Sequence, residues 1–522
     1  MCVPCVAEHD PAEAERLFSF EALERAYREC RKRKRRTRNA LRFEQDLEAN
    51  LIDLAHDLKS GAYRPLRSVC FVTTRPKCRE IVAADFRDRV VHHLLVKILE
   101  PAWERAFIHD SFASRKGKGT HAAVDRVESL VRKVTRNHTV RAWYAHLDIR
   151  SFFTSIDHGV LLAALARRPA PPTALWLAER IIRRPIAPDA VLRGSRASFA
   201  SVPPGKSLLR APPGKGLPIG NHTSQFFANV FLDALDRYVK RVLGVRHYVR
   251  YVDDMLLLSR SREELIAWRE AIDRFLREEL RLELNRRRSR IAPVSSGIDF
   301  LGYVIHPRHR LVRRRVVGKL RARLSAFERS LTREAHGYRW VLYRPGESER
   351  LRAVAAAYGA HLKKASTHRL RASLHGRFPW LRRALIRSDG KPFWEAPAAF
   401  PCLGAQAHWL ASRFPGAVLA LRVGRSWEFH GPSAQAAARV GGVRMFRGWR
   451  AGSRGWARMP AGGLPGFLER AAAAGVGRIV VVREAGDGSG RVRARAPSAA
   501  GILAREGNAP DPAEPGSRAS RG

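Results

Sequence analysis

The stretch YVRYVDDMLLL, residues 248–258, decides how the rest of the sequence is interpreted. Two hydrophobic runs flank the adjacent acids Asp253 and Asp254, a pattern that predicts a β-hairpin whose turn presents two carboxylates. A second apolar run, WYAHL at residues 143–147, ends at Asp148. Isolated buried carboxylates are costly, so acids in such a setting usually have cation partners. Taken alone, an Asp-Asp pair is more often a polar turn, and only its neighbours weaken that interpretation.

The chemistry of three carboxylates favours a divalent cation. Mg²⁺ prefers hard oxygen ligands and is typically held by one or two carboxylates together with substrate phosphates. Two such ions, about 3.5–4 Å apart, stabilise the attacking and leaving oxygens of an in-line phosphoryl transfer. Asp148, Asp253 and Asp254 are therefore candidates for holding two Mg²⁺ ions, for which Mn²⁺ is an expected substitute.

The order of the surrounding motifs resembles that of reverse transcriptases. Residues 251–254 match the Y-x-D-D motif, and roughly residues 63–390 share the resemblance. The other matching segments are 75–81 (fingers), 114–120 (the following block), 147–153 (motif A), 216–225 (motif B), 282–288 (motif D) and 300–303 (the primer-grip motif E). The resemblance implies an α+β right-hand polymerase with fingers, palm and thumb, which copies RNA into DNA by two-metal nucleotidyl transfer.

The resemblance also implies roles for individual residues. Asp148, Asp253 and Asp254 would be catalytic and hold the metal ions with the backbone carbonyl of Ile149. The expected substrate-binding residues are Lys77 and Arg79 on the triphosphate, Phe153 as a gate against a ribose 2′-hydroxyl, Ile219, Gly220 and Gln225 beside the nascent pair, and Arg288 in motif D. Ordinary core packing of Phe153 and ordinary surface positions for Lys77 and Arg79 are the plain alternatives.

Two positions depart from the commonest family pattern. Motif D usually carries Lys, proposed as a general acid, whereas Arg288 stands here; a guanidinium hardly ever gives up a proton, so its role would be electrostatic, unless the register is off by one. Most retroelement enzymes carry P-Q-G in motif B, but this chain has Pro218-Ile219-Gly220 followed by Ser224-Gln225. That pattern is similar to the reverse transcriptases of diversity-generating retroelements, whose cDNA carries errors concentrated at template adenines.

Other assignments stay open at this stage. A retron, an abortive-infection enzyme and a group II intron-type reverse transcriptase are alternatives, although an H-N-H nuclease signature is not evident near the C-terminus. A non-catalytic nucleic-acid-binding relative of a polymerase is a further alternative, against which the three intact acids argue. The expected partners are template RNA, primer, cDNA product and dNTPs, with a small basic helical accessory protein suggested by the family.

Charge points the same way. The 522 residues include 96 Lys and Arg against 49 Asp and Glu, a formal net charge of +47. Such a chain repels itself unless polyanions screen it, which favours nucleic acid as a partner. Because 81 of the basic residues are Arg, GC-rich coding is an alternative cause. Six cysteines do not suit a disulfide scaffold or a zinc site, and no apolar run of about 18 residues suggests a membrane span, so we expect a cytoplasmic protein.

Composition divides the chain into five expected segments. They are a basic helical segment at 1–62, fingers and palm at 63–310, a helical thumb at 311–392, an α/β accessory domain at 398–497 and a disordered tail at 498–522. The accessory segment resembles the N-terminal domain of the mismatch-repair protein MutS around Leu419–Phe429. In that domain an F-x-E motif inserts its Phe beside a mismatch; Ser426 and Glu428 stand at the matching positions, so only Trp427 is left as a possible wedge. An uncharacterised α/β interaction module is the alternative.

Overall fold

The computed structural model describes residues 8–32, 37–74, 78–186, 190–343, 345–381, 403–446, 455–484 and 502–508. The chain divides into two compact units, an N-terminal unit (Met1–His309) and a C-terminal unit (Arg310–Gly522). In the described residues no helix is both long enough and apolar enough to cross a membrane.

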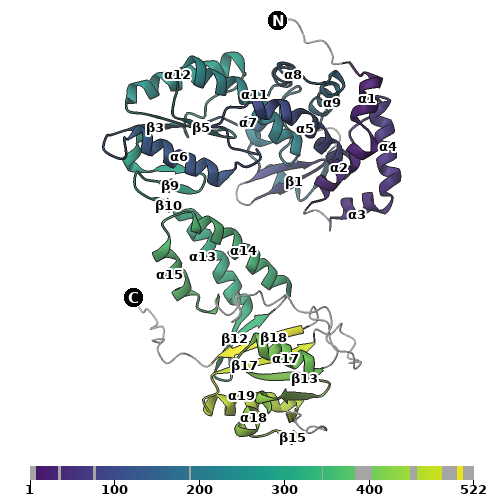
Figure 1. The fold of residues 1–522 in the computed structure, drawn as a ribbon, viewed down its shortest axis with the longest axis vertical. Helices are drawn as coiled ribbons and strands as arrows, with labels where there is room; N and C mark the ends of the chain where they lie inside the picture. Colours follow the sequence, from purple (N-terminus) through teal and green to yellow (C-terminus); the bar gives the residue numbers. More distant parts are fainter. Residues whose placement is uncertain are drawn as a thin grey trace. The chain divides into compact units, whose positions relative to one another are not determined.

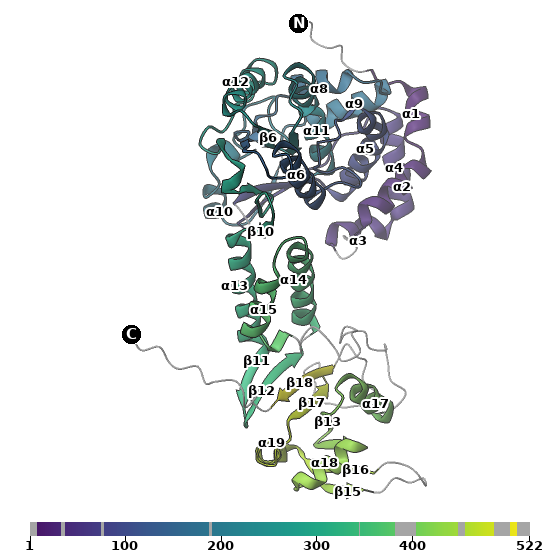
Figure 2. The ribbon, with the colours of Figure 1, turned by 60° about the vertical axis from the view of Figure 1, so that its left-hand side comes forward.

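The first helices of the N-terminal unit are part of its main core. They are α1 (Pro11–Leu17), α2 (Phe20–Arg31), α3 (Arg38–Gln45) and α4 (Leu47–Lys59). They gather beside α5 (Phe86–Ala106), as Figures 1 and 2 show, and their buried residues join one hydrophobic cluster with α5 and the central sheet. Of the basic run at 31–36, Arg31 pairs with Glu44 and Lys32 pairs with Glu29, while residues 33–36 lie outside the described residues.

The central sheet positions the predicted carboxylates. It has the strand order β5-β6-β3-β7 and is antiparallel throughout; its strands are β3 (Trp143–Asp148), β5 (Tyr248–Tyr251), β6 (Asp254–Ser259) and β7 (Arg290–Pro293). Because side chains alternate along a strand, Leu147, Met255 and Leu257 face the main core, and Asp148 and Asp254 face the other side. Helices α6 (Thr120–Val134) and α12 (Arg262–Glu279) both contact this sheet (Figure 1).

The N-terminal unit has further helices and a second hairpin. They are α7 (Phe152–Ser155), α8 (His158–Ala166), α9 (Pro172–Ile182), α10 (Arg196–Ala200), α11 (His222–Arg237), and the β8 (Ile298–Phe300) and β9 (Tyr303–Ile305) hairpin. In the sequence, Val90, Val91, Leu94, Leu95 and Ile98 recur at helical spacing and predict a helix, and α5 confirms it with the first four of them buried.

A hairpin of β1 (Val69–Thr73) and β2 (Arg79–Ala83) forms where the β-branched residues predict it. The expected turn at Arg75–Pro76 and the triphosphate ligand Lys77 lie outside the described residues. The many Pro, Gly and Ser residues between Ile182 and Leu217 predict an extended loop, but β4 (Val191–Arg193) within this segment pairs in parallel with β1. Buried Glu80 fastens this segment to β2, since its carboxylate accepts hydrogen bonds from Ser207 Oγ (2.5 Å) and the backbone N–H of Leu208 (2.7 Å).

The C-terminal unit departs from the expected division into a thumb and a separate domain. Its helices are α13 (Arg314–Leu331), α14 (Pro345–Lys363), α15 (His368–Arg377), α17 (Leu403–Arg413), α18 (Pro432–Val440) and α19 (Leu464–Ala473). Its strands are β10 (Arg310–Val312), β11 (Thr332–Ala335), β12 (Tyr338–Tyr343), β13 (Val418–Val423), β14 (Ser426–His430), β15 (Arg444–Phe446), β16 (Trp456–Pro460), β17 (Arg478–Glu484) and β18 (Ile502–Asn508). An eight-stranded sheet with the order β11-β12-β18-β17-β13-β14-β16-β15 joins both expected segments.

Two expectations for this unit are therefore corrected. The segment expected to be a helical thumb contains the β11–β12 hairpin, which becomes part of the C-terminal sheet because β18 pairs with both β12 and β17. That same strand lies inside the segment expected to be disordered, because a short stretch beginning Ile502-Leu503 finds strand edges to pair with. The boundary expected near residues 392–398 falls outside the described residues.

Trp427 does not serve as a wedge in this structure. It is buried in the hydrophobic cluster of the C-terminal unit, and its indole N–H donates to the carbonyl of Ala461 at 3.0 Å. Inserting it between bases would open that core. Neither Ser426 nor Trp427 therefore supplies an accessible aromatic wedge at the position where the MutS-like pattern has one.

Asp88 gives the N-terminal unit a predicted pH dependence. Burial raises the pKa of Asp88 to about 6, against the opposing effect of hydrogen bonds from Tyr63 Oη (2.9 Å) and the Leu66 N–H (2.7 Å). A carboxyl whose pKa is raised by folding binds its proton more tightly in the folded state, so its contribution to stability is lost as pH rises from about 4 to about 6. We expect the parent protein to lose about 2 kcal/mol of unfolding free energy relative to Asp88→Asn over this range.

Urea unfolding of both proteins at several pH values measures that difference, and the Asn variant cancels the titration of every other group. A difference in unfolding free energy that stays constant from about pH 4 to pH 7 would contradict the raised pKa of Asp88.

Candidate active site

Two of the three predicted acids lie directly opposite each other. Asp148 ends β3, Asp254 begins β6, and the antiparallel register pairs these two residues. Asp253 lies in the turn that connects β5 to β6, so it is the neighbour of Asp254 in the chain. The three acids therefore meet at one end of the central sheet, as the two apolar runs predict.

Asp148 has its own set of partners. Asn285 Nδ2 donates to Asp148 Oδ2 at 2.8 Å, and the N–H of Asn285 donates to the carbonyl of Asp148 at 2.7 Å. Arg288 Nη1 lies 3.7 Å from the same Oδ2. The structure thus brings the motif D segment against motif A, and Arg288 is placed where its charge acts on Asp148.

Asp254 and Asp253 differ in their surroundings. His146 Nε2 lies 3.5 Å from Asp254 Oδ1, whereas Asp253 makes no ion pair with any described residue. Burial, followed by the nearby charges of Asp254 and Asp148, raises the pKa of Asp253 to about 7. The charge of Arg79 acts in the opposite direction, which places this fingers residue within electrostatic range of the carboxylate.

These carboxylates fit a divalent cation that has additional oxygen ligands. Crowded negative charge and hard oxygen donors suit Mg²⁺ or Mn²⁺. Among the described residues, no three His, Cys, Asp or Glu side chains converge into a group that could hold an ion by themselves. A cation here would therefore be held partly by oxygens from outside these side chains. Ile149, the fourth predicted ligand, has a buried side chain and is bridged to Leu284.

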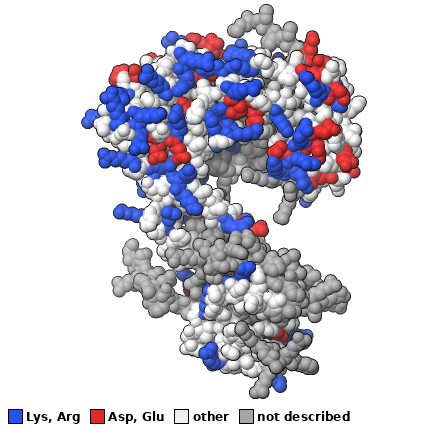
Figure 3. Space-filling view, in the orientation of Figure 1, with Lys and Arg blue, Asp and Glu red and all other residues white. Residues whose placement is uncertain are grey.

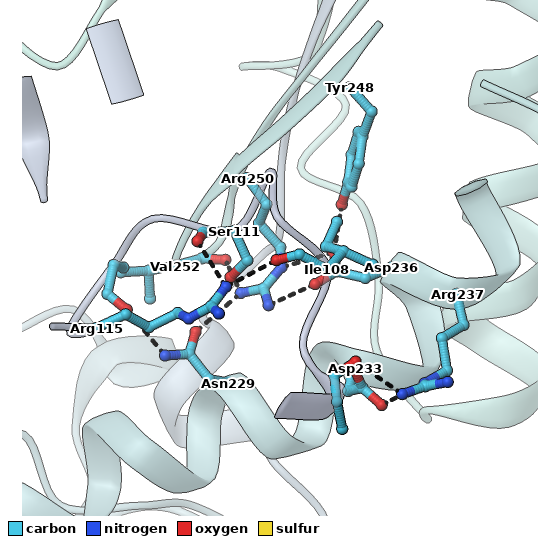
Figure 4. A network of polar contacts seen from close by, with 12 residues as sticks. Ile108, Ser111, Arg115, Asn229, Asp233, Asp236, Arg237, Tyr248, Arg250 and Val252 are labelled. Atoms are coloured by element: carbon cyan, nitrogen blue, oxygen red, sulfur yellow. Dashed lines mark hydrogen bonds and ion pairs between the residues drawn. The ribbon is translucent and has the colours of Figure 1, made fainter. Parts of the chain in front are cut away.

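The turn that carries Asp253 is strained, and the side chain of Arg250 holds it by a hydrogen bond. Val252 has φ +56°, a conformation that costs a β-branched residue about 1–3 kcal/mol. The guanidinium of Arg250 donates to the Val252 carbonyl at 3.2 Å and forms a two-pronged ion pair with Asp236 of α11 (Figure 4). Both members of that pair are fully buried.

The segment that resembles motif B, residues 216–225, is held by main-chain hydrogen bonds. The N–H of Leu217 donates to the carbonyl of Phe153 at 2.7 Å, and the N–H of Val82 donates to the carbonyl of Ile219 at 3.1 Å. Gly220 has φ +126°, and a Cβ there would lie 3.0 Å from Ile81 Cγ2. The structure therefore brings Phe153, Ile219 and Gly220 together with the fingers hairpin.

The side chains of the predicted substrate residues Phe153 and Gln225 contact other parts of the N-terminal unit. Phe153 is partly buried against the main core, with its ring edge-on to Phe152 at a centroid distance of 5.3 Å. Gln225 is exposed at the start of α11 and accepts a hydrogen bond from Ser114 Oγ at 3.0 Å. Lys and Arg are spread over the visible face of the N-terminal unit in Figure 3, with Asp and Glu between them.

Sequence reasoning missed three kinds of residue in this site. Asn285 lies in the motif D segment, residues 282–288, but no role was predicted for it. An amide directly after alternating apolar residues is a recognisable hydrogen-bond donor to a carboxylate. His146 precedes Asp148 by two residues, so the period of a strand places both on one face. The partner of Arg250, Asp236, lies 14 residues earlier on α11, and no local pattern connects them.

Residues 73–305 match the family described as "Reverse transcriptase (RNA-dependent DNA polymerase)". Protein YkfC of Escherichia coli K12 is 26% identical over 311 residues, which cover 53% of this chain and 75% of YkfC. The group II intron-encoded protein LtrA of Lactococcus lactis subsp. cremoris is 20% identical over 326 residues, half of each chain. Nuclear intron maturase 2 of Arabidopsis thaliana is 26% identical over 140 residues, 27% of this chain and 17% of the maturase.

Among solved structures, telomerase from Candida albicans in complex with a TWJ fragment of telomeric RNA is 11% identical over half of each chain, with a TM-score of 0.35, a likeness too slight to argue from. The mixed helix-and-sheet architecture agrees with the α+β polymerase fold expected from the motifs. The match to the reverse transcriptase family over residues 73–305 supports an RNA-directed DNA polymerase domain in this part of the chain.

Gly220 provides a test of how the motif B segment is held. We expect Gly220→Ala to lower the efficiency of dNTP incorporation at least tenfold. The backbone at residue 220 has a positive φ, which Ala adopts only with strain, and the added Cβ would meet Ile81 and the carbonyl of Val82 (3.4 Å). Gly214→Ala is the matched control, since Gly214 also has a positive φ (+73°) but open space around its Cβ. Single-nucleotide extension kinetics measure both, and equal losses would mean that contact with the fingers hairpin is unimportant.

Proposed function

We propose that this protein copies an RNA template into cDNA, with Asp148, Asp253 and Asp254 holding the divalent cations of nucleotidyl transfer. The observation that supports this most directly is the pairing of Asp148 with Asp254 beside the crowded carboxylate of Asp253, whose pKa is raised to about 7. Template RNA, primer and dNTPs are the substrates, and Mg²⁺ is the expected cation. Bound there, the cations would stabilise negative charge on the reacting oxygens.

The chain's own residues would prepare the reactants. In the reaction, the primer 3′-hydroxyl attacks the α-phosphate of a dNTP, a phosphodiester bond forms and pyrophosphate leaves. Arg79 lies within electrostatic range of Asp253 and would neutralise part of the triphosphate. Asn285 and Arg288 orient the Asp148 carboxylate, and Phe153, tied to Leu217 through its backbone, would border the sugar.

Two finer assignments remain candidates. Ile219, in place of the usual Gln, supports a diversity-generating type that makes errors at template adenines. The relatives named as intron-encoded proteins and maturases support a group II intron type. The MutS-like resemblance of residues 398–497 would add an accessory role in nucleic-acid contact, which the buried Trp427 does not support.

Asp253→Asn tests the cation site. We expect this variant to lose at least 100-fold in primer extension on an RNA template with Mg²⁺, because a neutral amide replaces the carboxylate. RNA binding should change less than twofold, because basic side chains contact the phosphates. Asp53→Asn, at an exposed position on α4, is the control and should match the parent in both measurements. Extension by Asp253→Asn within tenfold of the parent would exclude this site.

Ile219→Gln tests the finer assignment. Ile219 has no polar side-chain atom, so it reads only shape, whereas an amide can add a hydrogen bond worth about 0.5–1.5 kcal/mol, a two- to tenfold change in discrimination. On the diversity-generating assignment, the variant should lower misincorporation most strongly opposite template adenine. Sequencing cDNA made by both proteins from one template decides, and an error spectrum that is unchanged, or lowered equally at all four bases, would argue against the adenine-specific role.

A further inference from the structure

We propose that Arg250 is a positioning residue: its guanidinium fixes the peptide between Val252 and Asp253 and so determines how tightly the adjacent carboxylates bind a divalent cation. The inference rests on the proposed function only in taking Asp253 and Asp254 as cation ligands. Arg250 is paired with Met255, whose side chain faces the main core, whereas Asp254 faces the other side of the sheet. Arg250 therefore acts on the carboxylates through the turn.

The turn has a conformation that its sequence does not favour. Tyr251 pairs with Asp254, which leaves Val252 and Asp253 as a two-residue hairpin loop. Val252 has a positive φ (+56°) and Asp253 does not, which is the pattern of a type II′ turn. Gly is the usual residue at the first central position of that turn, whereas β-branched residues avoid it. Something outside the loop must therefore hold it in place.

Arg250 supplies that hold from a fixed direction. Its Nε and Nη2 donate to the two carboxylate oxygens of Asp236 at 2.8 and 2.7 Å, which sets the plane of the guanidinium. The remaining nitrogen, Nη1, donates to the carbonyl of Val252 and to Asn229 Oδ1, both at 3.2 Å. Because the Val252 carbonyl belongs to the peptide that joins Val252 to Asp253, this bond selects one orientation of that peptide.

The frame behind Arg250 is itself anchored. Asn229 Nδ2 donates to the carbonyl of Ala113 at 2.9 Å, and Tyr248 Oη donates to Asp236 Oδ1 at 2.8 Å. The backbone of Arg250 exchanges hydrogen bonds with Asp110 and Phe112 on the neighbouring segment. Figure 4 shows Asn229 and Asp236 of α11 beside the guanidinium, with Tyr248 of β5 directed at Asp236. The position of Nη1 is thus defined by three parts of the chain.

Rotation of the Val252–Asp253 peptide would interconvert two hairpin turns. Type I′ and type II′ turns share a positive φ at the first central residue and differ in the sign of φ at the second. Without the bond to Nη1, the loop can adopt other turns, and the carboxylate of Asp253 changes direction relative to Asp254. Lys in place of Arg250 keeps the charge that faces Asp236 but lacks the fork that reaches Val252.

The experiment measures Mn²⁺ binding without nucleic acid, from the electron paramagnetic resonance signal of unbound Mn²⁺, beside thermal unfolding and primer extension. We expect Arg250→Lys to weaken Mn²⁺ binding about tenfold and to raise the Mg²⁺ concentration for half-maximal extension by a similar factor. In the Arg250→Lys background, Val252→Gly should recover most of the Mn²⁺ affinity, because Gly adopts the positive φ without strain. Arg250→Lys should also lower the melting temperature, and the double variant should not recover it, because Asp236 is still poorly paired.

Asp233→Asn is the matched control. It breaks the buried pair of Asp233 with Arg237 on the same helix (2.6 Å), which does not touch the turn, so it should lower the melting temperature and leave Mn²⁺ affinity unchanged. If Arg250→Lys does not fold, Asn229→Ala carries the test, with an expected two- to fivefold loss of affinity. Parent-like Mn²⁺ affinity in the folded Arg250 or Asn229 variant overturns the inference. Parent-like affinity in Asp253→Asn would instead overturn the proposed cation site.

Discussion

The buried ion pair between Arg250 and Asp236 is the interaction on which the arrangement of the candidate site depends. It joins β5, which leads into the paired acids, to α11, whose first turn belongs to the motif B segment. Breaking such a pair by removing one partner typically costs about 3–5 kcal/mol, because the other charge remains buried. The pair therefore helps to fix the proposed cation ligands relative to the motif B segment within the N-terminal unit.

The second constraint is made of main chain. The motif B segment is connected to motif A by Leu217 and Phe153, and to the fingers hairpin by Val82 and Ile219, through backbone N–H and carbonyl groups. Side chains in this segment are consequently free to differ without changing its path. That explains how Ile can stand at 219 where most retroelement enzymes have Gln, and why Gly220, whose Cβ would meet Ile81, is the less replaceable of the two.

Local patterns predicted the parts of this molecule that local patterns control. The apolar runs around Asp148 and Asp253 predicted β3, β5 and β6. The same reasoning could not join β12 to β18, because strand pairing over more than 160 residues leaves no periodic signal. It also missed Arg250 as a structural residue, since a charged side chain within an apolar run acquires its meaning from Asp236 on another element.

The same logic explains how a strongly basic protein retains a crowded acidic site. With 96 basic residues in the chain, an acid that needed only neutralisation would readily find a cation, and Asp148 does lie near Arg288. Asp253 has no such ion pair among the described residues, although it is partly buried and its pKa is raised by desolvation and by its acidic neighbours. Folding thus leaves one carboxylate with uncompensated charge in a turn whose conformation is itself strained. A divalent cation and its phosphate ligands would neutralise the crowded negative charge, and the free energy of their binding would offset the strain at Val252. This is the physical reason for favouring a polymerase over a relative that only binds nucleic acid.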